Sequence, residues 1–132
     1  MAIVVGFVPS PEGRAALTRA IEEAALRGRR LIVLNASRGD ALVDRRHSSA
    51  EDWQDVQQQL SDSGVDHEVL QQVEAKDPAE QILDVARQTN AELIVVGLRR
   101  RSPVGKLIMG SQAQQILLEA DCPVLAVKAH AS

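Results

Sequence analysis

Aromatic side chains are nearly absent from this chain of 132 residues, which contains one Phe, one Trp and no Tyr. Proteins that bind single-stranded nucleic acid stack its bases on aromatic side chains, and this chain has only two aromatic side chains to offer. The formal net charge of −3 gives no overall attraction toward a polyanion either. We therefore expect no nucleic-acid partner.

Cysteine is scarce as well, since Cys122 is the only one in the chain. A single thiol cannot form a disulfide within the chain, and a reducing cytosol is the simplest environment for it. No apolar run approaches the length of a transmembrane helix, and the first residues, MAIVVGFVPSP, lack the basic region of a secretion signal. These absences predict a cytoplasmic protein with no membrane partner.

The residues that carry most enzyme chemistry are few and scattered. His47, His67 and His130 show no metal-ligand spacing, and Cys122 stands in an apolar context before Pro123. The carboxylates follow solvated helix faces, and no nucleophile with a neighbouring base can be named. We predict no metal site, no catalytic residue and no enzyme, with slow nucleotide hydrolysis left open.

Short apolar runs alternate with helical patterns along the whole chain. Hydrophobic residues make up 45% of it, and its length predicts one domain spanning residues 1–132. Strands are predicted at residues 2–8, 31–36, 67–73, 92–96 and 123–127. The continuous aliphatic run at 92–96 predicts burial on both faces of a sheet. Such alternation is typical of an α/β fold: an open five-stranded parallel sheet with helices on both faces.

The helical stripes lie at residues 17–25, 53–60, 78–86 and 111–120. Asp77, followed by Pro78 and Glu80, predicts a helix start with the character of a capping box. In the last helix, Ile116 and Leu117 are expected to face inward. The polar stretch at residues 37–49 is expected to be a loop.

The most informative stretch is GLRRRSPVGKLIMGS, residues 97–111, between a buried strand and a helix. The N–H groups of a helix's first turn, the positive end of its dipole and nearby arginines all favour a phosphate. Gly97 would let the backbone leave the strand and approach a ligand with no Cβ in the way. Gly110 and Ser111 would offer N–H groups and a hydroxyl, and Arg99 to Arg101, or Lys106, would neutralise charge.

A plainer interpretation fits the same residues. Gly97 would be a glycine at a strand end, Ser111 an ordinary helix N-cap, and the arginines part of a solvated loop. Turns of this kind are common in α/β proteins, so the spacing alone leaves both interpretations open.

Four separated motifs occur in order along the chain: SPE before an alanine-rich helix, DPAEQI at 77–82, AELIVVG at 91–97 and GSQAQQILLEADCPVLAVK at 110–128. With them, essentially the whole chain resembles the universal stress protein family in its small, single-domain bacterial form. The resemblance implies a Rossmann-like fold of the adenine nucleotide alpha hydrolase type, with strand order 3-2-1-4-5. It also implies a homodimer, often joined through the exposed edge of strand five, which here has nothing left in the chain to cover it.

ATP-binding members of that family look like G-x2-G-x9-G-S/T in the loop after strand four. The spacing from Gly97 to Gly110 and Ser111 is kept here, but Arg100 stands in place of the middle glycine. The acidic residue that members usually carry near the ribose aligns with Val8. The resemblance thus implies a phosphate half that is mostly present and a ribose half that is altered.

The implied ligand is an adenine nucleotide, ATP in the first place, with AMP and ADP as alternatives and Mg²⁺ as a companion ion. Adenine contacts are expected at the end of strand two, from Asn35 and Ala36. The other expected contacts surround the phosphates: Pro9, Ser10, Gly97, Arg99, Arg100, Gly110 and Ser111.

Two functions therefore stand side by side. The first is a nucleotide-binding regulatory protein of the cytoplasmic stress response, in which ATP occupancy alters the dimer or its affinity for an unknown regulatory protein. The second is a dimeric interaction module that binds no nucleotide and acts through protein partners. Val8 and Arg100 favour the second, whereas the retained spacing from Gly97 to Ser111 favours the first, which we prefer.

Overall fold

The computed structural model describes residues 1–35, 46–71, 77–100, 107–108 and 110–129. For residues 46–52, 99–100 and 107–108 it describes the backbone alone.

Five parallel strands form the central sheet in the spatial order β3-β2-β1-β4-β6. They are β1 (Ala2–Phe7), β2 (Arg30–Asn35), β3 (His67–Gln71), β4 (Ala91–Arg100) and β6 (Val124–Lys128). The predicted α/β class and the order 3-2-1-4-5 are confirmed, with β6 as the fifth parallel strand. A further strand of two residues, β5 (Leu107–Ile108), pairs antiparallel with the end of β4.

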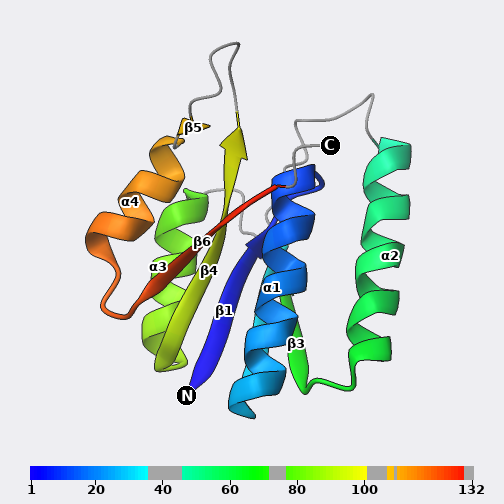
Figure 1. Ribbon diagram of the computed structural model, residues 1–132, viewed down its shortest axis with the longest axis horizontal. Coiled ribbons are helices and arrows are strands. Elements are labelled where there is room, and N and C mark those ends of the chain that lie inside the picture. Colours follow the sequence, from blue (N-terminus) through cyan, green and yellow to red (C-terminus); the bar gives the residue numbers. More distant parts are fainter. Residues whose placement is uncertain (36–45, 72–76, 101–106, 109, 130–132) are drawn as a thin grey trace.

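Helices cover both faces of this sheet (Figure 1). The helices α1 (Pro11–Arg27) and α2 (Arg46–Ser63) pack on one face. The helices α3 (Pro78–Gln88) and α4 (Ser111–Glu119) pack on the other. The predicted cap is confirmed, since the Asp77 side chain accepts a hydrogen bond from the Glu80 N–H at 3.4 Å.

The core consists of two apolar layers, one on each face of the sheet. Alternate residues of a strand point to opposite faces, so Ile3, Val5 and Phe7 of β1 face α1 and α2, whereas Ala2 and Val4 face α3. The predicted burial of the aliphatic run on both faces is confirmed, because residues 93–96 contribute to both layers. The two layers fix the sheet between the helices.

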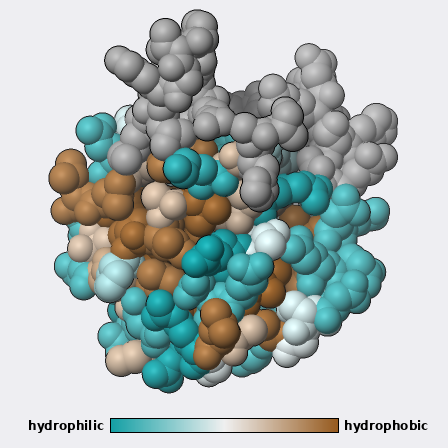
Figure 2. All heavy atoms as spheres, viewed as in Figure 1, coloured by the Kyte–Doolittle hydropathy of each residue, from teal (hydrophilic) through white to brown (hydrophobic). Residues whose placement is uncertain are grey.

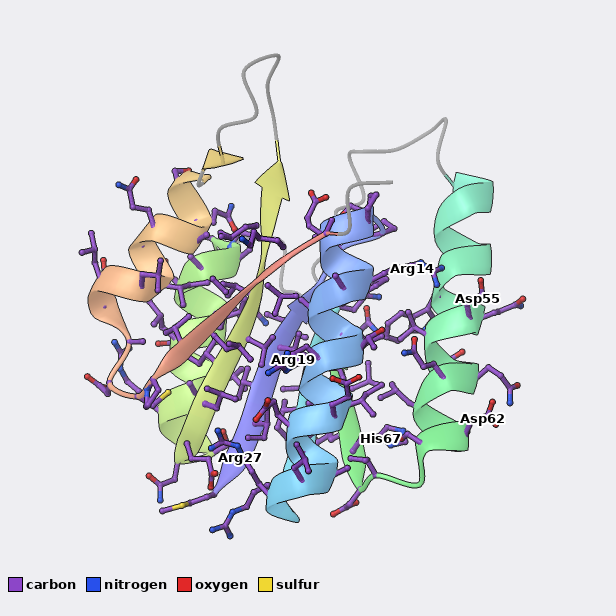
Figure 3. The ribbon with its side chains drawn as sticks, viewed as in Figure 1. Arg14, Arg19, Arg27, Asp55, Asp62 and His67 are labelled. Atoms are coloured by element: carbon purple, nitrogen blue, oxygen red, sulfur yellow. The ribbon has the colours of Figure 1, made fainter. Side chains whose placement is uncertain are left out.

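Polar contacts join α1 to α2 at the rim of the first layer. Arg14 Nη2 lies 3.4 Å from Asp55 Oδ2, and Gln59 Nε2 donates to Thr18 Oγ1 at 3.1 Å. Figure 3 shows Arg14 and Asp55 turned toward each other across the gap between the two helix axes. These contacts are exposed, so they orient the helices more than they stabilise them.

Three expectations about the elements are wrong. The helix α2 begins at Arg46, so the predicted loop at 37–49 ends too late; residues 36–45 lie outside the described part. Leu117 is 38% exposed although Ile116 is 2% exposed, because consecutive helical residues point about 100° apart and α4 buries a narrow face. The strand β4 continues past residue 96 to Arg100.

Candidate functional site

The strand order reverses between β1 and β4. These two strands are paired, with Val5 opposite Val95, while β2 and β3 lie beyond β1 and β6 lies beyond β4. Ligands of open α/β sheets bind outside the carboxyl ends of the strands at such a reversal. We call this end the carboxyl rim: the ends of β3, β2, β1 and β4 at residues 71, 35, 7 and 97–100. Both α1 and α4 begin there (Figure 1).

Pro9 and Ser10 form the turn that leads from β1 into α1. The Ser10 N–H donates to the Val8 carbonyl at 2.8 Å, and Ser10 Oγ accepts from the Gly13 N–H at 3.0 Å. Ser10 is therefore the N-cap of α1, and Pro11 follows in the first turn, where its missing N–H costs nothing. A hydroxyl that accepts this bond keeps its own proton, so Ser10 retains a donor for a phosphate oxygen.

Gly97 lies inside β4, opposite Val127 of β6. A Cβ at Gly97 would overlap the Glu12 carbonyl oxygen in the first turn of α1, and a Cβ at Gly13 would overlap the Val8 carbonyl. The prediction that the chain leaves the strand at Gly97 is wrong, because β4 continues to Arg100. Position 97 has no room for a Cβ because α1 contacts it, and not because the chain turns there. Contact between Gly97 and a ligand stays a prediction.

The predicted phosphate ligands Arg99 and Arg100 extend β4 beyond Gly97. Arg99 pairs with Ile108 and Arg100 with Leu107 in the antiparallel contact with β5. The backbone at Arg100 is thus part of a strand pair. The side chains of both arginines, and residues 101–106, lie outside the described part.

The helix α4 begins at Gly110 and Ser111, as predicted. Gly110 is the N-cap, with φ −68° and ψ 162°, and no side chain caps the helix. The interpretation of Ser111 as the N-cap is therefore wrong, since it is the first helical residue. Both residues are exposed, and a Cβ at Gly110 would meet nothing within 4 Å. The first turn of α4 thus faces open space.

Asn35 ends β2 and is bound to a residue that the sequence analysis missed. Its Nδ2 donates to Gln71 Oε1 at 3.2 Å, and the two residues are register partners. Gln81 of α3 donates its Nε2 to the Gln71 carbonyl at 3.4 Å. No sequence spacing signals this pair, because it depends on the register between β2 and β3. Ala36 lies outside the described part.

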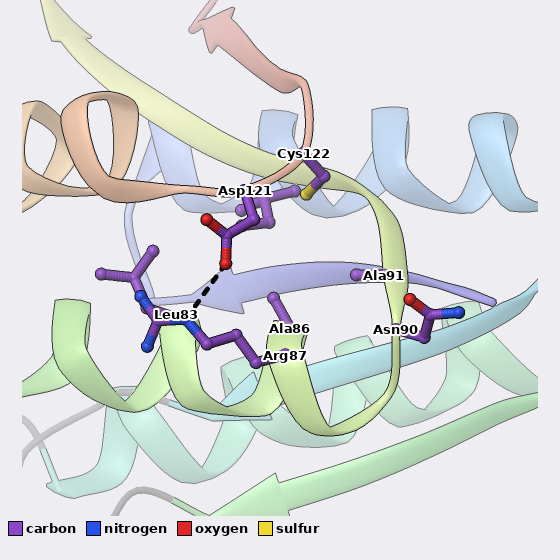
Figure 4. Close-up of a pocket in the computed structure, with 8 residues that line it drawn as sticks. Leu83, Ala86, Arg87, Asn90, Ala91, Asp121 and Cys122 are labelled. Carbon is purple, nitrogen blue, oxygen red and sulfur yellow. Dashed lines mark hydrogen bonds and ion pairs between the residues drawn. The ribbon is translucent and has the colours of Figure 1, made fainter.

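A cavity of about 280 Å³ lies at the opposite end of the sheet (Figure 4). Its polar wall consists of Arg87, Asn90, Asp121 and Cys122. Arg87 Nε already lies 3.3 Å from Asp121 Oδ2, so its charge is neutralised. Burial, and secondarily Asp121, raise the pKa of the Cys122 thiol, which opposes thiolate chemistry. This cavity is distant from the rim and has no part in the predicted site.

Neither a metal-binding cluster of side chains nor a helix suited to span a membrane occurs within the described ranges. No group of three His, Cys, Asp or Glu side chains there is placed to hold a metal ion. None of the helices described combines the length and apolar character that crossing a bilayer requires. The ring of His67 is bound through Nδ1 to the Val65 carbonyl at 2.8 Å, while the side chains of His47 and His130 are outside the described part.

Comparison with known proteins agrees with this geometry. A model of the universal stress protein family matches residues 1–128. The chain belongs to the universal stress protein family. It is 49% identical to a universal stress protein of Mycolicibacterium smegmatis over 97% of this chain and 98% of that one.

Solved structures of universal stress proteins share the fold. One from Archaeoglobus fulgidus has a TM-score of 0.77 and 34% identity, covering 97% of this chain and 98% of its own. Another from the same organism, in complex with dAMP, has a TM-score of 0.72 and 27% identity with the same coverage.

This universal stress protein departs from the expected nucleotide-binding pattern at two places on the carboxyl rim. Val8 is 37% exposed just beyond the end of β1, so an apolar side chain stands where the resemblance places a carboxylate. Arg100 stands where it places a glycine, in the strand pair with β5. Both departures flank the point where the strand order reverses.

Proposed function

We propose that this universal stress protein binds an adenine nucleotide, ATP in the first place, at the carboxyl rim. The observation that carries the proposal is the exposed start of α4 at Gly110 and Ser111, which no side chain caps. N–H groups and the positive end of the dipole are thus turned toward an anion at the place where the strand order reverses. The 27% identical Archaeoglobus fulgidus relative in complex with dAMP supports a nucleotide as that anion.

The proposed contacts divide along the rim. The phosphates lie against α4 and the end of β4, and the base lies toward β2, near Asn35 and Ala36. Mg²⁺ would neutralise the phosphates together with the arginines. The residues proposed around the phosphates are Pro9, Ser10, Gly97, Arg99, Arg100, Gly110 and Ser111.

We propose a regulatory role in the cytoplasm and no catalysis. The sequence offers no nucleophile with a neighbouring base, so a bound nucleotide would act by changing the affinity for a partner. Slow hydrolysis is tested by release of inorganic phosphate, which should not exceed that of a buffer control.

Substitution of Gly110 tests the nucleotide site. Gly110→Asp adds a capping carboxylate in open space, which stabilises α4 by a few tenths of a kcal/mol but repels a phosphate. Thermal melting should show stabilisation of wild type by about 2.7 kcal/mol when ATP is about a hundred times its dissociation constant. That stabilisation should disappear in Gly110→Asp.

Gly110→Asn is the matched control, because it caps the helix without charge and should retain more of the ATP effect than Gly110→Asp. If wild type shows no shift and no calorimetric heat at millimolar ATP with magnesium, the proposal is wrong.

A specific observation also favours a dimeric interaction surface. The strand β6 lies at the edge of the parallel sheet, and Val124, Leu125, Ala126 and Val127 are only half-buried there. Leu118 on α4 is 80% exposed. Figure 2 shows hydrophobic side chains gathered over the α4 and β6 side of the molecule. We propose that a second copy covers this surface, whether or not a nucleotide binds.

A further inference from the structure

The ends of four strands form a row along the carboxyl rim. Gln71 of β3 is paired with Asn35 of β2, and Asn35 with Phe7 of β1, which neighbours β4. Neighbouring strands are about 4.8 Å apart, so Gln71 lies roughly 14 Å from β4. A nucleotide whose phosphates lie at β4 and α4 would extend along this row and bring its base over β2 and β3.

Asn35 and Gln71 belong to the same side of the sheet as the start of α1. Their strands place Val33 and Val69, two residues earlier, in the layer under α1 and α2, and side chains alternate with a period of two. Gly97, whose missing Cβ faces Glu12 of α1, is on this side as well. The amide pair and the end of β4 therefore face the same space.

The hydrogen bond between the two amides gives Gln71 a defined orientation. Asn35 Nδ2 donates to Gln71 Oε1, and this bond uses one lone pair of that oxygen. The outer edge of the Gln71 amide keeps an acceptor, the second lone pair of Oε1, beside a donor, an N–H of Nε2. Acceptor and donor side by side are the pattern with which Gln and Asn recognise adenine.

The backbone of Gln71 is held from the other face of the sheet. Gln81 is the one polar side chain that is buried among the described residues, and it donates to the Gln71 carbonyl at 3.4 Å. Burying an amide is unfavourable unless it is hydrogen-bonded, so this contact fixes the end of β3 at the cost of a polar group in the core. Gln71 is thus anchored at its backbone and oriented at its side chain, as a recognition group requires.

We infer that Gln71 contacts the nucleotide base, that Asn35 is its positioning residue, and that the pair selects adenine over guanine. The inference rests on the nucleotide site proposed above. With Oε1 held beside Asn35, the adenine 6-amino group donates to Oε1 and adenine N1 accepts from Nε2. Guanine presents its O6 acceptor where adenine has the amino donor, so two acceptors would meet.

Titration calorimetry with ATP and with GTP tests this. In Gln71→Ala the dissociation constant for ATP should rise about tenfold, within the 5- to 150-fold range of a bidentate contact to a base. The ratio of GTP to ATP dissociation constants should fall toward one. The control is Gln59→Ala, which removes a comparable amide, bonded to Thr18 between α2 and α1, and should leave both constants unchanged.

Asn35→Asp reverses the orientation of Gln71. A carboxylate only accepts, so Nε2 would turn toward position 35 and Oε1 away from it. The donor would then face the guanine O6, and the acceptor would face the guanine N1–H. The ratio of GTP to ATP dissociation constants should fall by a factor of about five or more, since about fivefold is the effect of the weakest bidentate contact.

The outcomes separate this inference from the function beneath it. If wild type binds neither nucleotide, the proposed function is wrong and this inference with it. If wild type binds ATP and GTP equally, or Gln71→Ala keeps the wild-type ratio, the inference is overturned while the nucleotide site stands.

Discussion

At the scale of single residues, glycines on the carboxyl rim serve different purposes. Gly97 and Gly13 are glycines because backbone carbonyls occupy the positions of their Cβ atoms. Gly110 has open space at that position. A motif of spaced glycines thus combines a packing requirement with a free surface.

Replacing Gly97 separates these two purposes. Gly97→Ala should lower the free energy of unfolding by about 1–3 kcal/mol, because α1 must move away from β4 to admit a methyl group. Gly110→Ala should change it by only a few tenths of a kcal/mol, because the poorer N-cap is offset by the lower conformational entropy of the unfolded chain. Denaturant unfolding without nucleotide measures both, and equal stability of the two variants would contradict the packing argument.

Ser10 has a structural role that is compatible with its proposed contact to a phosphate. Its hydroxyl caps α1 through the Gly13 N–H at 3.0 Å and keeps a proton to donate. The phosphate contact of Ser10 stays a prediction from the sequence, and the structure adds the cap, which spacing to Gly13 alone does not reveal.

At the scale of elements, arginines tie the end of α1 to the start of β4. Glu92 at that start lies 2.9 Å from Arg27 Nη1 and 2.8 Å from Arg29 Nε, and Arg27 also binds Glu23 at 3.1 Å. Figure 3 shows Arg27 at this end of α1. The hydrogen bond from Arg27 is the main cause that lowers the pKa of Glu92, and hydrogen bonds from Arg19 and Arg27 lower that of Glu23.

A pH-dependent loss of stability follows from this cluster. Because the folded-state pKa of Glu92 is lowered, its ionised form stabilises the fold above the ordinary glutamate pKa, about 4.3. This stabilisation is lost as the pH falls below the ordinary glutamate pKa and then through the lowered pKa of folded Glu92. When the pH is lowered from about 6 to about 3, the melting temperature of Glu92→Gln should therefore fall less than that of wild type.

Glu22→Gln is the control for that measurement, since Glu22 lies on the same helix and reaches Arg19 only at 4.0 Å. Its melting temperature should fall on acidification by as much as that of wild type. An equal loss in Glu92→Gln and wild type would contradict the role of the cluster.

The elements themselves were largely predictable, and the exceptions have two causes. Local signals such as Asp77–Pro78 fixed helix starts, and aliphatic runs located the strands. The extension of β4 to Arg100 was not predictable, because it depends on pairing with β6, which is distant in sequence, and with β5, which was not predicted as a strand. Leu117 was misplaced because a nine-residue helix can bury either of two adjacent apolar positions.

At the scale of the whole molecule, β6 decides how copies of the chain would meet. The Ile94 N–H donates to the Pro123 carbonyl at 3.1 Å. In a parallel ladder the bonds to β4 then recur at residues 125 and 127, so the N–H of Ala126 points to the outer edge. That edge is available for pairing with a second copy.

Proline at this position tests the dimer. Ala126→Pro removes an outward N–H and leaves the bonds to β4 intact, so the chain should fold as a monomer of 14.3 kDa. Wild type and the control Ala126→Ser, which keeps the N–H, should show twice that mass in sedimentation equilibrium. A monomeric wild type at high concentration would refute the dimer.

The sequence by itself determined the α/β class, most positions of the strands and helices, and the start of α4 at Gly110, because each depends on residues close together in the chain. Only the tertiary structure shows that the contact with Glu12 excludes a side chain at Gly97 and that the polar side chains at the ends of β2 and β3 are bonded to each other. Glu12 meets Gly97, and Asn35 meets Gln71, through strand order and register, which bring distant segments together in ways that no local spacing encodes.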